Sequence, residues 1–118
     1  PEIKVVQLLG AKPEGVNTTK ALAESGADVI FVQDEEWVSP ALQSARANKQ
    51  LLILNNHDLT DKHPGLVLTT LLKHTDLALY LAIHNYNHNE WKHGSQTLGI
   101  DSGYIDYVIS RHNKAMIP

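Results

Sequence analysis

Two short stretches of the sequence each place a histidine four residues ahead of a second potential metal ligand. His57 is followed by Asp61, and His84 is followed by His88. Imidazole and carboxylate groups bind divalent cations such as zinc, iron, manganese and nickel. A cation held there would activate a bound water as a hydroxide nucleophile. The spacing therefore predicts a site for one or two divalent transition metal ions.

Three consecutive carboxylates, Asp34, Glu35 and Glu36, follow an apolar run. Asp34 stands nearest to the end of that run, so we expect it to be a further metal ligand. Glu35 is the candidate general base of the site, because a carboxylate within reach of a bound water can accept its proton. The alternative is that the glutamates form the first turn of a helix, where negative charge is favourable.

The histidines also have a simpler interpretation, in which they follow strands and bind the backbone of their own loops. The chain would then be a non-enzymatic module that senses a ligand or assembles into an oligomer. The loop at residues 10–20 does not decide between these alternatives. It matches neither a P-loop nor the GxGxxG pattern, and turn and capping residues account for it.

Composition limits the class of protein. The chain has 118 residues, a formal charge of −3 and no cysteine. The absence of cysteine excludes disulfides and thiolate metal sites and is typical of a cytoplasmic protein. Without a cluster of basic residues we expect no nucleic-acid partner, and without a long apolar run we expect no membrane span. The expected partners are a small-molecule ligand and further copies of the chain, as a homo-oligomer. The apolar residues 115–118 are also compatible with a piece of a larger protein.

Apolar runs alternate with amphipathic stretches along the chain. The predicted strands are residues 3–9, 27–32, 51–54 and 76–83. The predicted helices are residues 17–25, residues 40–48, a segment starting at Pro64 and a last segment starting at Asp101. Gly26 is expected to terminate the first helix. The inner face of the helix from Pro64 would consist of Val67, Leu68, Leu71 and Leu72. Residues 85–99 are expected to form a polar loop.

Helices that connect successive strands favour parallel pairing with right-handed crossovers. The sequence therefore predicts an α/β fold, as a single three-layer domain over residues 1–118 with a mostly parallel sheet of four or five strands. In such sheets ligands bind outside the carboxyl ends of the strands. The histidines and carboxylates named above would then share one edge.

Three stretches of the chain resemble the NIF3-like family, which has a dinuclear metal centre and is often described as a second type of GTP cyclohydrolase I. They are ALAESGADVIFVQDEEW, LLILNNHDLTDKHPG and LVLTTLLKH, and the resemblance covers about residues 3–75. The first is similar to the family's helix and apolar strand that ends in metal ligands. The second is similar to its strand with a His-x-x-x-Asp pair.

The resemblance implies that His57 and Asp61 are metal ligands. The family's adjacent histidine pair falls on Gln33 and Asp34, a departure that leaves only Asp34 able to coordinate a cation well. His84 and His88, or a second subunit, would have to complete the site. The function expected from these observations is a metal-dependent hydrolase acting on a small phosphorylated or nucleotide-type substrate.

Overall fold

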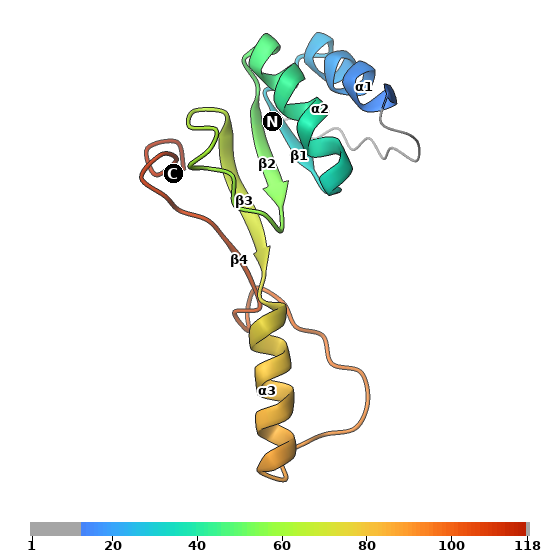
Figure 1. Cartoon of the computed structure of the whole chain (residues 1–118), viewed down its shortest axis with the longest axis vertical. Helices are drawn as coiled ribbons and strands as arrows, with labels where there is room; N and C mark the ends of the chain where they lie inside the picture. The colour runs from blue at the N-terminus through green and yellow to red at the C-terminus, as the bar shows by residue number, and fades with distance from the viewer. Residues whose placement is uncertain (1–12, 118) are drawn as a thin grey trace.

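The computed structural model describes the backbone of residues 13–117 and the side chains of residues 17–117. The strand expected at residues 3–9 lies outside the described residues. The elements, in chain order, are α1 (Pro13–Glu24), β1 (Val29–Val32), α2 (Glu35–Asn48), β2 (Leu51–Asn55), β3 (Val67–Lys73), α3 (Thr75–Asn87) and β4 (Ile105–Tyr107) (Figure 1).

The four strands form one sheet in the order β1-β2-β3-β4. β1 and β2 are parallel, with Val29 opposite Leu51. β2 and β3 are also parallel, whereas β4 runs antiparallel to β3. The predicted α/β class with a mostly parallel sheet is therefore confirmed. That one domain spans residues 1–118 stays a prediction.

The hydrophobic core lies between the sheet and α2. β1 alternates strictly, with Ile30 and Val32 buried and with Val29 and Phe31 44% and 52% exposed. Alternation of this kind indicates a strand with only one covered face. The buried apolar side chains are Ile30, Val32, Ala41, Ala45, Leu52, Leu54, Leu66 and Val67. Within the described part of the chain, α2 covers this face and α1 lies beside α2 (Figure 1).

The end of α1 is fixed by Gly26. Its φ of 84° is left-handed, a conformation that glycine adopts without strain. The backbone N–H of Gly26 donates to Ala23 O, and that of Ala27 donates to Leu22 O. This pair of bonds is a Schellman motif, which satisfies carbonyl groups of the last helical turn. The prediction that Gly26 terminates this helix is confirmed.

The helix predicted from Pro64 is wrong, because residues 67–73 form β3. Its apolar residues are spaced as on a helix face, but a short buried strand can show the same pattern. Val67 and the threonines that follow are β-branched and favour extended backbone. Pro40, expected to open a helix, is instead inside α2, which begins at Glu35.

The strand predicted at residues 76–83 and the helix predicted from Asp101 are also wrong. The first segment is in α3, because its leucines and alanines are strong helix formers. The second contains β4. Gly103, with a φ of 74°, ends a turn just before β4, and β3 offers an unpaired edge for the extended chain. The polar loop expected at residues 85–99 begins after α3, so its first residues are helical.

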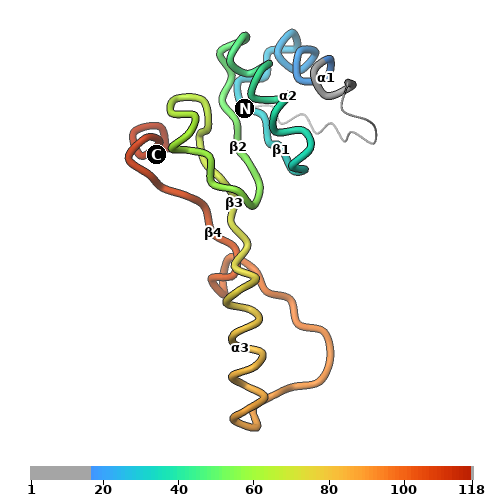
Figure 2. The backbone as a smooth tube through the Cα atoms, viewed as in Figure 1, coloured from blue at the N-terminus to red at the C-terminus, as the bar shows by residue number. Residues whose placement is uncertain are grey.

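α3 extends away from the sheet, and among the described elements it has no substantial packing partner (Figures 1 and 2). β3 and β4 lead to it and away from it, and His74 N–H donates to Tyr104 O where the two strands leave the sheet. The radius of gyration is 17.4 Å, against roughly 13.5 Å for a compact chain of this length. The molecule therefore consists of a packed body and a projecting arm, which we define as residues 74–104. No helix in the described residues is long and apolar enough to cross a membrane.

Candidate functional site

The carboxyl ends of β1, β2 and β3 meet at one edge of the sheet, from which the arm projects (Figure 1). Polar residues follow each of these strands. Asn55 Nδ2 donates to Gln33 O over 3.0 Å, which joins the ends of β2 and β1. Asn56 N–H donates to Leu71 O over 2.8 Å, which joins β2 to β3. These bonds join the end of β2 to the end of β1 and to Leu71, two residues before the end of β3.

Asn55 offers this edge an unused hydrogen-bond acceptor. Its Nδ2 is engaged by Gln33 O, while its Oδ1 is buried without a partner among the described residues. Leaving a buried acceptor unpaired costs about 1–3 kcal/mol. The bond to Gln33 also fixes which way the amide points. The orientation of this unpaired acceptor is therefore set by the protein itself.

His57, Glu35 and Asp34 lie at this edge, as the sequence predicted. His57 Nε2 is 3.4 Å from Glu35 Oε2, and both side chains are largely exposed. Asp34 precedes α2 as its N-cap, with no capping hydrogen bond from its side chain. Glu35 is therefore the first residue of α2, which is the position that the alternative interpretation gave it. Its carboxylate also contacts the imidazole of His57.

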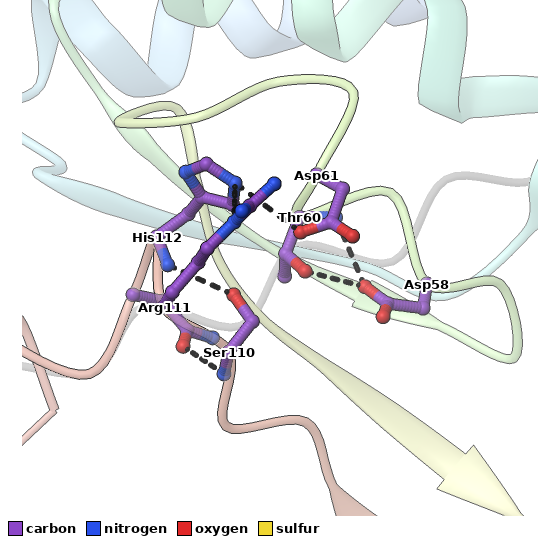
Figure 3. Close-up of polar contacts among 7 residues, drawn as sticks. Asp58, Thr60, Asp61, Ser110, Arg111 and His112 are labelled. Atoms are coloured by element: carbon purple, nitrogen blue, oxygen red, sulfur yellow. Dashed lines mark hydrogen bonds and ion pairs between the residues drawn. The ribbon is translucent and has the colours of Figure 1, made fainter.

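Asp61 lies apart from His57 although it is only four residues away. β2 and β3 are parallel neighbours, so residues 56–66 must run back along the sheet from the end of one strand to the start of the next. Asp61 Oδ1 is 3.4 Å from His112 Nε2, and Figure 3 shows this pair beside Asp58, Thr60 and Ser110. Asp58 Oδ1 accepts hydrogen bonds from both the N–H and the hydroxyl of Thr60, which shapes the turn.

His84 and His88 lie together on α3, away from the sheet (Figure 1). Their rings stack with centroids 4.1 Å apart, and His88 Nδ1 is 2.8 Å from His84 O. The two histidines were expected to follow a strand and so to lie at the carboxyl edge of the sheet. They do not lie at that edge, because residues 75–87 form a helix. Within the described residues no group of three or more histidine or acidic side chains could hold a metal ion.

Sequence reasoning missed Lys73, which is the last residue of β3. Its side chain is exposed and supplies a cation next to the polar strand ends. The residue was assigned to a helix, so its position at the carboxyl edge was not recognised. The alternation of Val67, Thr69 and Leu71 would have been the signal for a strand ending there.

One protein-family model matches residues 2–117, nearly the whole chain, and its description is Bmp, ABC transporter substrate-binding protein PnrA-like. Among curated proteins none matches the sequence.

The family match overturns the resemblance to NIF3-like proteins, because it includes all three stretches on which that resemblance rested. The predicted function, a metal-binding protein and hydrolase, is wrong for the same reason: the family binds substrates for transport. Whether the chain also takes up one or two divalent transition metal ions is a separate property, and that uptake stays a prediction that elemental analysis can check. The chain belongs to the Bmp family of PnrA-like ABC transporter substrate-binding proteins.

Proposed function

We propose that this chain captures a small polar solute for an ABC transporter, and that the solute binds at the carboxyl edge of the sheet. The family match carries the first part of the proposal. The second part rests on the general position of ligand sites in open α/β sheets. The residues proposed to contact the solute are Lys73, Asn55, Asn56 and Asp34.

The chemistry of this edge favours a solute with several hydrogen-bonding groups. Asn55 Oδ1 accepts, and the Lys73 ammonium donates up to three hydrogen bonds. Asp34 is an exposed carboxylate with no capping role for its side chain. A purely apolar molecule would leave these groups desolvated and unpaired, which is unfavourable.

To enclose the solute, a second part of the protein must cover this edge of the sheet. Ligand sites in proteins enclose about 70–90% of the surface of a small ligand, whereas Asp34, Asn56 and Lys73 are exposed at an open edge. Binding proteins of transporters enclose their ligands by hinge motion. The pair of strands β3 and β4 leads from this edge to the arm, and their contact between His74 and Tyr104 is the proposed hinge point.

Isothermal titration calorimetry against a panel of sugars, amino acids and nucleosides tests the proposal. The variant Lys73→Gln removes the cation, and Asn55→Leu removes the free acceptor. Both are expected to weaken binding of whichever solute gives heat by about tenfold or more, equal to 1.4 kcal/mol. Lys92→Gln, which removes a charge from the arm, is the matched control and should leave binding unchanged.

Failure of every panel member to bind the folded chain would count against solute capture. If both variants bind the solute as tightly as the parent chain, the proposed function stands but the solute binds at another place. The homo-oligomer and the cytoplasmic location expected from the sequence stay predictions. Native mass measurement tests the first, and fractionation of cells tests the second, with a periplasmic position as the contrary outcome.

A further inference from the structure

A hollow of about 500 Å³ lies at the opposite, amino edge of the sheet. Its walls come from the carboxyl end of α2, the start of β2 and the turn that precedes β3. Because strands β1 to β3 are parallel, this hollow and the carboxyl edge are separated by the length of the sheet. A ligand bound here would not touch the proposed solute site.

Three cationic side chains line the hollow: Arg46, Lys49 and Lys62. No carboxylate is among its lining residues, and the contacts of the described chain include no ion pair for any of the three. Glu24 and Asp28 line a neighbouring, smaller hollow, which shares Lys49 and Gln50 with the first. The lining of the hollow is therefore positively charged, although the formal charge of the whole chain is −3.

Among the described residues, the hydrogen bonds at the carboxyl end of α2 are made by the backbone and by Asn48, not by the cationic side chains. Basic side chains often stabilise the carboxyl end of a helix by binding its free carbonyl groups. Here the backbone N–H groups of Lys49 and Gln50 both donate to Ala45 O. Asn48 Nδ2 donates to Ser44 O over 2.9 Å. The carbonyls of Ser44 and Ala45 are thus bound by groups other than these cations, and both Arg46 and Lys49 line the hollow.

His63 adds a second observation at the same place. It lines the hollow, and its Nδ1 is buried without a partner among the described residues. The backbone around it is fixed, because His63 O accepts the N–H groups of Leu66 and Val67. An imidazole can donate through either ring nitrogen. His63 therefore brings to the lining of the hollow an imidazole that has one ring nitrogen without a partner among the described residues.

We infer that this hollow binds a small, multiply charged oxyanion of the phosphate type. The planar guanidinium of Arg46 can donate to two oxygens of such a group at once, and Lys49 and Lys62 neutralise its charge. The same chemistry is presented by a free phosphate compound and by the headgroup of an anionic lipid. The inference does not depend on the solute site.

Titration calorimetry of the full chain with inorganic pyrophosphate tests the inference. We expect saturable heat and a loss of about tenfold in affinity, or 1.4 kcal/mol, in the double variant Lys49→Asn/Lys62→Gln. Asparagine is chosen at position 49 because Lys49 has a left-handed φ of 56°, which asparagine tolerates. The matched control is Lys20→Gln/Lys92→Gln, which removes the same charge elsewhere and is expected to change affinity less than twofold.

The single variant His63→Leu distinguishes specific binding in the hollow from nonspecific electrostatic attraction of anions to the protein surface. It changes no permanent charge, so a drop in pyrophosphate affinity with an unchanged circular dichroism spectrum supports a defined site. Equal losses in the double variant and its control, or no heat from the parent chain, would overturn the inference. Sedimentation with vesicles of phosphatidylglycerol, compared with phosphatidylcholine, then distinguishes a lipid headgroup from a free phosphate compound.

Discussion

The body and the arm of this molecule treat their apolar side chains in opposite ways. In the body, Leu52 and Leu54 are enclosed between the sheet and α2. In the arm, α3 has no buried residue, and Leu79 and Tyr80 are 63% and 62% exposed. A helix that is apolar around its whole circumference is normally enclosed by other parts of a protein. The body therefore has a hydrophobic core of its own, whereas the apolar side chains of α3 have no cover among the described residues.

Truncation of a core leucine tests the body most directly. Leu52 is fully buried, so Leu52→Ala should lower the free energy of unfolding by about 2–5 kcal/mol through lost burial and a cavity. The exposed Leu79→Ala on α3 should cost less than about 0.5 kcal/mol. Urea unfolding followed by circular dichroism measures both. Equal losses would mean that α3 belongs to the cooperative unit.

Hydrogen exchange tests the same comparison without a substitution. Amide protons of α2 are held in a packed helix, whereas a free helix of the length of α3 is marginal in water. We expect α3 amides to exchange at least about a hundredfold faster than those at the centre of α2. Mass spectrometry of peptic fragments reports the two rates. Similar protection in both helices would show that α3 is covered in solution.

The last segment of the chain returns from the arm to the body, and Asn113 anchors it. Asn113 is fully buried; its Oδ1 accepts the N–H of Ser110, and its Nδ2 donates to Val108 O. Loss of these bonds in Asn113→Ala should cost about 1–3 kcal/mol. Asn87→Ala, at the exposed end of α3, is the control and should change stability little. Thermal unfolding monitored by fluorescence compares them, and a negligible effect at Asn113 would mean that this segment is not docked.

The sequence allowed better prediction of the elements before residue 64 than of those after it. Around Gly26 and in residues 27–55, caps, turns and apolar runs agree with one another, and the predicted elements there are close to those observed. From residue 64 onward three elements were assigned the wrong type. Val67–Lys73 and Thr75–Asn87 are both short and apolar, so periodicity alone cannot distinguish strand from helix. Propensity was the better guide, because threonine and valine fill the first and leucine and alanine the second.

The sequence indicated where the candidate site lies better than it indicated which residues lie there. The carboxyl edge and the residues Asp34, Glu35 and His57 were placed correctly at the ends of strands. His84 and His88 were not, because their helix was taken for a strand, and Lys73 was overlooked for the converse reason. Asp61 could not be placed from spacing, since residues 56–66 have no regular structure and run back along the sheet. The class of function came from the whole-chain family match and not from any short motif.

The order of the strands has a consequence for how the chain folds. β1, β2, β3 and β4 are neighbours in the sheet in the same order as in the sequence. During synthesis, each of the strands β2, β3 and β4 can therefore pair with the strand synthesised just before it. Among these four strands, none must be inserted between two earlier ones. The closure entropy for each new pairing stays small, since the connecting segments are short, except for the excursion through the arm before β4. We expect the first three strands and α2 to assemble during synthesis, with β4 pairing last.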